Sequence, residues 1–258
     1  MISKNKIKYI RSLEMKKCRK ADGVFVAEGK KLVDDLIGAF DLVYIAATSP
    51  WLSQHSQQLS APSFSGVEVD EVSEDELRRI SFQEAPQQVL AIFRQRHLPV
   101  SISAIASTDL CLVLDDVQNP GNMGTIVRLA DWFGIHHIFC SEGSADIYNP
   151  KTVQATMGGM ARVQVYYANL PLLLSSLDAS IPIYGTFLDG SDIYSQELAS
   201  NGVIIMGNEG RGVSDLVAQH VTHRLLIPNY PPGAPTSESL NVAIATAIVC
   251  AEFRRPKA

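Results

Sequence analysis

The four cysteines of this 258-residue chain, Cys18, Cys111, Cys140 and Cys250, lie far apart and form no Cys-x-x-Cys pair. This spacing argues against a disulfide framework and a structural zinc site, so reduced and mostly buried thiols are expected. No apolar run is long enough to span a bilayer, and the basic N-terminus is not followed by the apolar segment of a signal peptide. We therefore expect a soluble, cytoplasmic protein with no membrane partner.

The sequence also lacks the two common nucleotide-binding patterns. The stretch GNEGRGVS at 207–214 is rich in glycine like a phosphate loop, but it has neither the Lys-Ser/Thr ending of a P-loop nor the spacing G-x-G-x-x-G. Glu209 within this stretch would repel a phosphate and suits a hydroxyl donor or a cation better, unless it caps the helix expected near Val213. A nucleotide-dependent dehydrogenase is therefore disfavoured.

Charge is distributed unevenly along the chain. The first 31 residues carry ten Lys and Arg against three acidic residues, which gives +7, and because the whole chain carries −5 the remainder carries −12. Such asymmetry is typical of a protein that meets an anionic partner, above all nucleic acid, through its N-terminus, although a solvated helix face gives the same pattern. The candidate RNA contacts are Lys16, Lys17, Arg19 and Lys20.

The length of the chain favours two domains, and the first is expected to be a small α/β unit at residues 1–95 with an RNA-binding role. Ile7, Ile10 and Leu13 recur at helical spacing between basic residues. Ser73 and Glu76 form a capping-box pattern at the start of another helix. Strands are expected at 24–27, 42–46, 67–69 and 89–93, and helices at 30–39 and 73–80.

Residues 96–108 are assigned to a linker, and the second domain is expected to begin at residue 109. Short apolar runs then alternate with helical patterns, which predicts a doubly wound α/β domain. Strands are expected at 110–114, 137–140, 163–166, 181–187, 203–206 and 225–227, and helices at 125–133, 150–157, 170–177 and 213–219. Ligands of such sheets bind beyond the carboxyl ends of the strands, so the loops that follow them are the candidate sites.

Residues 225–251 combine a short apolar strand, a proline-rich loop and a helix that is apolar on every face. The prolines between Pro228 and Pro235 exclude regular structure until Ser237, and either Ser237 or Ser239 suits the start of the helix. Asn241 in the first turn needs a polar partner, which can come from a capping network or from a ligand.

The loop after Leu114 predicts a tight turn, because Asn119, Pro120 and two glycines precede a helix that carries Arg128. A cation in the first turns of a helix opposes the helix dipole by about 0.3 to 1 kcal/mol. An anionic ligand or a buried carboxylate would compensate for this cost, unless Arg128 is simply a surface residue.

Taken in order, NPGNMGTIVR at 119–128, IIMGNEGRGVS at 204–214 and SESLNVAIATAI at 237–248 resemble the three motifs of the SpoU (TrmH) family of RNA ribose 2′-O-methyltransferases, in the SPOUT superfamily. FVAEG at 25–29 is similar to the family's N-terminal substrate-binding domain. The resemblance implies a SPOUT-type α/β domain at 109–258 with a deep trefoil knot, although knots are rare. It also implies S-adenosyl-L-methionine as cofactor and a homodimer with a shared active site.

The resemblance further implies that a ribose 2′-hydroxyl attacks the sulfonium methyl group without a metal. Arg128, from the other subunit, would stabilise the developing alkoxide, because a guanidinium stays protonated. The implied catalytic residues are Arg128, Asn122, Glu209, Ser239 and Asn241, and the implied cofactor-binding residues are Thr186, Gly207, Ile227 and Leu240.

The separate N-terminal domain favours ribosomal RNA as the substrate, because it suggests recognition of a structured site beyond the active-site loop. A tRNA ribose methyltransferase and a SpoU-like RNA-binding protein without turnover are the alternatives. The intact set of motif residues Arg128, Glu209, Ser239 and Asn241 speaks against the loss of turnover.

Overall fold

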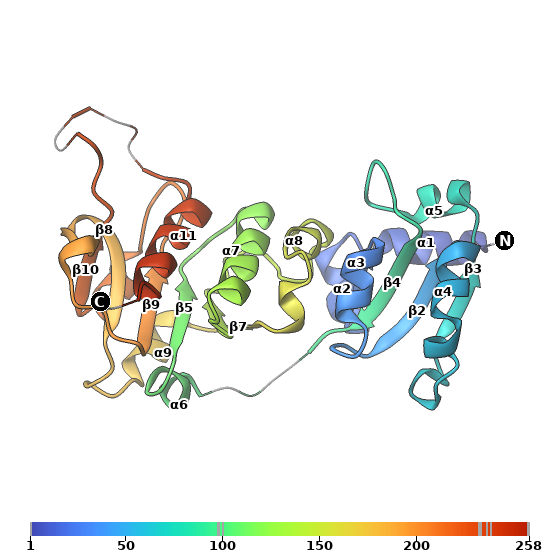
Figure 1. The fold of residues 1–258 in the computed structure, drawn as a ribbon, viewed down its shortest axis with the longest axis horizontal. Coiled ribbons are helices and arrows are strands. Elements are labelled where there is room, and N and C mark those ends of the chain that lie inside the picture. The colour runs from blue at the N-terminus through green and yellow to red at the C-terminus, as the bar shows by residue number, and fades with distance from the viewer. Residues whose placement is uncertain are drawn as a thin grey trace. The chain divides into compact units, whose positions relative to one another are not determined.

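Figure 1 shows a computed structural model of the chain, which describes residues 2–256 except 97, 98, 100, 232, 233, 236 and 238. The chain divides into two compact α/β units, one formed by residues 1–97 with 146–161 and the other by residues 98–145 with 162–258. Among the described residues, every helix is too short or too polar to cross a membrane.

The N-terminal unit is built on a four-stranded sheet with the order β1-β4-β2-β3. Strand β4, the last of the four in the sequence, lies between β1 and β2 and is antiparallel to both. Strands β2 and β3 are parallel to each other. All four strands were predicted; their bounds are β1 Val24–Glu28, β2 Leu42–Ala47, β3 Glu68–Glu71 and β4 Val89–Arg94. The helices are α1 Lys4–Ser12, α2 Lys16–Asp22, α3 Lys30–Leu36, α4 Ser49–Leu59 and α5 Glu74–Ile80, with a 3-10 turn at Pro62–Phe64.

Two local predictions for this unit are confirmed. Ile10 and Leu13 are fully buried in its core, so the basic N-terminal helix does carry an apolar stripe. The capping box is present, because the Ser73 hydroxyl accepts a hydrogen bond from the Glu76 N–H (3.2 Å) and the Glu76 carboxylate accepts one from the Ser73 N–H (3.0 Å). Helix α4 was not predicted, since Trp51 is its only buried residue and no apolar stripe marks it.

Residues 146–161, which the sequence placed in the second domain, pack with the N-terminal unit. They include helix α8 (Pro150–Ala155) and the 3-10 turn Gly159–Ala161. The Asp146 carboxylate pairs with Arg19 at 2.6 Å, and the ring centroid of Tyr148 lies 4.9 Å from that of Phe25 in β1. These contacts join the segment to α2 and to β1 of the N-terminal unit.

The second unit contains a six-stranded, fully parallel sheet with the order β10-β8-β9-β5-β6-β7. The parallel α/β pattern is therefore confirmed. Its strands are β5 Leu110–Leu114, β6 His137–Cys140, β7 Gln164–Tyr167, β8 Ile183–Asp192, β9 Gly202–Met206 and β10 His223–Leu226. Its helices are α6 Ile102–Ala106, α7 Pro120–Trp132, α9 Leu170–Ser175, α10 Asp215–Ala218 and α11 Val242–Phe253, with a 3-10 turn at Ile193–Ser195.

Three features differ from the sequence predictions. Helix α6 lies within the expected linker, because Ile102 and Ala106 are apolar enough to pack in the core. Helix α11 begins after Asn241, not at Ser237 or Ser239, because the Asn241 side chain supplies the N-cap. Strand β8 continues beyond its predicted end, and residues 186–190 form an excursion between its two regions of pairing with β10.

Candidate active site

The strand order of the second sheet reverses between β5 and β9, and ligands of parallel sheets bind at such a switch point. Because β5 and β9 are parallel neighbours, the loops that follow them leave the same edge of the sheet. The first loop leads into α7, whose N-cap Asn119 accepts hydrogen bonds from the N–H groups of Gly121 (2.8 Å) and Asn122 (3.2 Å). The turn predicted here is therefore the N-terminal cap of the helix.

Glu209, in the loop after β9, joins the two loops. Its carboxylate accepts a hydrogen bond from the Asn122 side-chain amide at 2.9 Å, and the N–H groups of Gln118 and Asn119 lie 3.4 Å from it. Burial alone would raise the pKa of this carboxyl, but the hydrogen bonds together outweigh that effect and lower its pKa below the ordinary value. Glu209 is thus an ionised acceptor held between the loops, while Ser214 is the N-cap residue of α10.

Asn241 extends this arrangement to the third motif. Its side-chain oxygen caps α11 by accepting from the N–H groups of Ala243 (2.9 Å) and Ile244 (3.3 Å). Its side-chain nitrogen donates to the Asn122 side-chain oxygen at 3.1 Å. A continuous chain of hydrogen bonds therefore runs from Asn241 through Asn122 to Glu209, and it joins three segments that lie far apart in the sequence.

Three further contacts that sequence reasoning missed fix the same loops. Asp116, which has a left-handed backbone (φ 61°), forms an ion pair with Arg211, and its carbonyl oxygen accepts from the Asn208 side chain at 2.8 Å. The buried Asp115 carboxylate accepts from the N–H of Ser214 at 2.7 Å. The signal available in the sequence was the Asp-Asp pair directly after an apolar strand, since two carboxylates there need partners.

Arg128 is exposed on α7 and has no hydrogen bond or ion pair with any described residue. Helix geometry places it about 9 Å along the axis from Asn122 and about 120° around it. It shares an exposed stripe with Thr125 and with Trp132, whose side chain is 83% exposed. Its guanidinium is therefore available to an anionic ligand but does not join the hydrogen-bond chain of Asn241, Asn122 and Glu209.

The structure leaves Ser239 and Leu240 outside the hydrogen-bond chain. Both are exposed, Leu240 to 47%, and they directly precede the Asn241 cap. The Ser239 hydroxyl has no hydrogen bond to a described residue. The part of the preceding loop formed by residues 232, 233, 236 and 238 lies outside the described residues.

The remaining cofactor candidates lie at or beyond the carboxyl ends of the neighbouring strands β8, β9 and β10. Thr186 follows the last residue of β8 that pairs with β9, Gly207 follows β9, and the half-buried Ile227 follows β10. A Cβ on Gly207 would lie 2.2 Å from the backbone of Gly212, so only glycine fits there. A partly exposed apolar side chain at Ile227 beside glycine backbone, with Arg211 already paired, suits the uncharged adenosine of S-adenosyl-L-methionine better than a phosphate.

The candidate RNA contacts of the N-terminal unit divide into two kinds. Lys16, Lys17 and Lys20 are exposed on α2. Arg19 is only 1% exposed and donates to the carbonyl oxygens of Leu13 and Glu14 as well as to Asp146. The prediction that Arg19 contacts RNA is corrected: its guanidinium is a buried structural group whose two terminal nitrogens, Nη1 and Nη2, donate to protein acceptors.

Replacement of Glu209 by glutamine should lower the unfolding free energy by about 1 kcal/mol at neutral pH, because the donors around it lose a charged acceptor. Since the pKa of the folded carboxyl lies below its ordinary value of 4.5, this contribution is present above that pH and is lost as the pH falls through the lowered pKa. Thermal unfolding of both proteins from roughly pH 7 to roughly pH 3 should show the difference shrinking in acid. A difference that is constant with pH would contradict the role of the charge.

Comparison with known proteins identifies the family of this chain. Residues 109–251 match the model of the SpoU rRNA Methylase family, and residues 4–91 match an MRM3-like substrate binding domain. The chain is 31% identical to the Bacillus subtilis protein named 23S rRNA (guanosine(2553)-2′-O)-methyltransferase RlmP, with 96% of each chain covered.

Two solved structures are similar to this chain over nearly its whole length. A Porphyromonas gingivalis structure described as a putative RNA methyltransferase of the TrmH family superposes with a TM-score of 0.87 at 41% identity and covers 99% of both chains. The AdoMet-bound rRNA methyltransferase of Sinorhizobium meliloti gives a TM-score of 0.85 at 32% identity and covers 99% of this chain and 96% of that one. The motif order, the parallel sheet and these matches together show that the chain belongs to the SpoU methyltransferase family.

Proposed function

We propose that this protein uses S-adenosyl-L-methionine to methylate the 2′-hydroxyl of a ribose in structured RNA in the cytoplasm, with ribosomal RNA as the substrate class. The observation that carries the proposal is the hydrogen-bond chain Glu209–Asn122–Asn241, with the exposed Arg128 on the same helix as Asn122. The names of the Bacillus and Sinorhizobium relatives support ribosomal RNA over transfer RNA.

When bound, S-adenosyl-L-methionine would supply an electrophilic methyl group to the ribose 2′-oxygen, whose proton would pass to solvent water. The protein must therefore position a weak nucleophile and stabilise the negative charge that develops on it. Arg128 provides that charge stabilisation, because a guanidinium does not act as a base near neutral pH. Glu209 and Asn241 hold the Asn122 amide in place, and the exposed Ser239 hydroxyl is available to the ribose.

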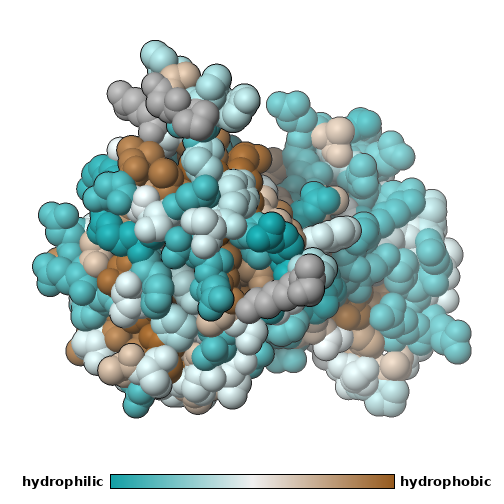
Figure 2. Space-filling view, turned by 60° about the vertical axis from the view of Figure 1, so that its left-hand side comes forward, coloured by the Kyte–Doolittle hydropathy of each residue, from teal (hydrophilic) through white to brown (hydrophobic). Residues whose placement is uncertain are grey.

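A homodimer with a shared active site would explain why Arg128 is exposed and does not join the hydrogen-bond chain around Asn122. Helices α7 and α11 pack against each other, and both present apolar side chains to solvent: Trp132 is 83% and Ile244 is 55% exposed. Brown hydrophobic areas are visible on the surface of this unit in Figure 2. Burial of these side chains against a second copy would bring Arg128 toward the partner's site. The trefoil knot implied by the family resemblance stays a prediction.

The dimer can be tested by light scattering. At micromolar concentration the mass should be twice the 28.2 kDa of one chain. Replacement of Ile244 by glutamate should shift the mass toward one chain and lower methyl transfer, because a charge would be buried in the contact. Replacement of the exposed Leu172 by glutamate, in α9, is the matched control and should leave the mass unchanged. A wild-type mass of one chain would contradict the shared site.

The exposed lysines of α2 are proposed to contact RNA. Neutralising Lys16, Lys17 and Lys20 together should lower RNA affinity and reduce the salt dependence of binding, with a slope change of roughly 0.7 to 0.9 for each phosphate contact that is lost. Binding of S-adenosyl-L-methionine should survive. Filter binding across a salt series measures both quantities, and an unchanged slope would show that these lysines are only a solvated helix face.

Transfer of labelled methyl groups from S-adenosyl-L-methionine tests the function itself. Unmodified ribosomal RNA should accept label at one ribose, which mapping by resistance to alkaline cleavage identifies. Labelling of transfer RNA alone would support the tRNA alternative. Cofactor binding and RNA binding without any transfer would support the non-catalytic RNA-binding protein.

A further inference from the structure

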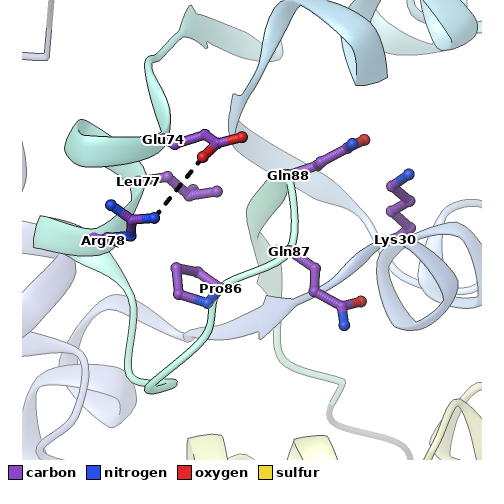
Figure 3. A pocket seen from close by; sticks show the side chains of 7 residues that line it. All are labelled: Lys30, Glu74, Leu77, Arg78, Pro86, Gln87 and Gln88. Carbon is purple, nitrogen blue, oxygen red and sulfur yellow. Dashed lines mark ion pairs between the residues drawn. The ribbon is translucent and has the colours of Figure 1, made fainter.

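The N-terminal unit contains a pocket of about 390 Å³ that involves none of the methyltransferase motifs. Its size lies within the range of about 300 to 1,000 Å³ that is common for small-molecule sites. Figure 3 shows Pro86, Gln87 and Gln88 between Lys30 of α3 and the side chains of α5. The complete lining is Lys30, Glu74, Leu77, Arg78, Pro86, Gln87 and Gln88.

The backbone of the loop that enters β4 is fixed by three hydrogen bonds. Gln88 has a left-handed backbone (φ 56°), which is uncommon for a residue other than glycine, and its carbonyl oxygen accepts from the Thr48 N–H at 2.8 Å. The N–H of Val89 donates to the Gln87 carbonyl at 2.6 Å, and the Val89 carbonyl accepts from Gly29 at 3.0 Å. In Figure 3 the carboxamides of Gln87 and Gln88 extend away from α5, on the side of Lys30, and neither side chain has a hydrogen bond to a described residue.

The charges around the pocket differ from one side to the other. The Lys30 ammonium is exposed and has no ion pair with a described residue, whereas the adjacent Lys31 pairs with Asp35 at 2.8 Å. Across the pocket, Arg78 pairs with Asp75 at 2.9 Å and lies 3.8 Å from Glu74. The lining of the pocket therefore offers an uncompensated cation and two unused amide groups on one side and a partly compensated carboxylate on the other.

These groups can bind the two polar parts of one nucleotide, its phosphate and its base. A lysine binds phosphate as a point charge, and a glutamine amide both donates to and accepts from the edge of a base. A carboxylate accepts from the amino group of a base. In duplex RNA these edges are paired and difficult to reach, so proteins read them in single-stranded loops and bulges.

We propose that this pocket binds one unpaired nucleotide of the RNA substrate, with its phosphate at Lys30 and its base edge at Gln87, Gln88 and Glu74. The proposal rests on the proposed function, because it assigns the pocket to the RNA that is methylated. The pocket thereby contributes to the choice of RNA at a place separate from the methyl-transfer chemistry.

The test measures binding of a fluorescein-labelled single-stranded 12-mer RNA of mixed sequence to the full chain by fluorescence anisotropy. Replacement of Lys30 by methionine should lower affinity about five-fold at roughly 0.1 M salt, since one phosphate contact contributes a slope of about 0.7 for single strands. Replacement of Gln87 by alanine should lower affinity without changing the salt slope. Replacement of Lys31 by methionine removes the same charge one residue away, outside the pocket, and should change affinity less than two-fold, roughly.

Equal losses for the Lys30 and Lys31 variants, or an equal loss for the Lys30 variant on the fully paired duplex of the same sequence, would overturn the proposal. An unchanged affinity of the Gln87 variant would also overturn it, because the carboxamide would then make no contact with a base. Unchanged melting temperatures verify that the variants fold. Binding needs no methyl transfer, so failure of the proposed function appears separately, as an absence of label in RNA from S-adenosyl-L-methionine.

Discussion

Replacement of Arg128 by alanine is expected to lower the rate of methyl transfer by about 100- to 1,000-fold, which is the loss typical of a group that stabilises developing charge. The side chain is exposed and has no partner among the described residues, so its removal breaks no contact within the fold. Affinity for S-adenosyl-L-methionine should stay nearly unchanged, because the residue is assigned to RNA. Single-turnover transfer and calorimetric titration of the cofactor measure the two effects.

Two further variants make this test specific. Replacement of Arg128 by lysine should also fail, because an ammonium cannot reproduce the planar fork of donors. Replacement of Arg162 by alanine is the control, since that guanidinium is already held by Asp131 at 2.7 Å through two of its nitrogens. Turnover near the wild-type rate in either Arg128 variant would remove this residue from the mechanism.

Replacement of Arg19 by methionine is expected to destabilise the N-terminal unit by about 3 to 5 kcal/mol, the range measured when one partner of a buried ion pair is removed. The change leaves the Asp146 carboxylate, whose side chain is 15% exposed, without its cation. It also leaves the carbonyl oxygens of Leu13 and Glu14 without the donors that hold the turn between α1 and α2. Urea unfolding followed by the fluorescence of Trp51, which is fully buried in this unit, reports the change.

The neighbouring residue supplies the control for this prediction. Lys20 is exposed, and its replacement by methionine should change stability by less than about 0.5 kcal/mol. Replacement of both Arg19 and Asp146 by apolar residues should recover part of the loss, because no uncompensated charge then remains buried. If the Arg19 single variant is as stable as the Lys20 variant, the buried ion pair does not hold residues 146–161 in place.

Most strands could be predicted because each is a short apolar run that ends at a polar or glycine-rich loop, as in 110–114 and 203–206. Helix α11 could be predicted for its apolar residues, but its start could not be located among Ser237, Ser239 and Asn241. Serine and asparagine both cap helices, and the choice depended on the position of Asn122, whose side chain accepts a hydrogen bond from Asn241, 119 positions away. Helices α4 and α6 carry too few buried residues for a readable periodicity.

For the candidate site, the sequence by itself determined which residues gather at one edge of the sheet. Parallel strands place their carboxyl ends at one edge, so Asn122 and Glu209 must both lie at that edge. The strand order that puts β9 beside β5, and so brings these two residues together, came from the tertiary structure. Only the tertiary structure decided which charged side chains have a protein partner and which are exposed to a ligand. In the sequence Arg19 is one more cation in a basic run, like Lys16 and Lys30. Its burial depends on an aspartate 127 positions away, and local patterns carry no information about a partner that distant in the chain.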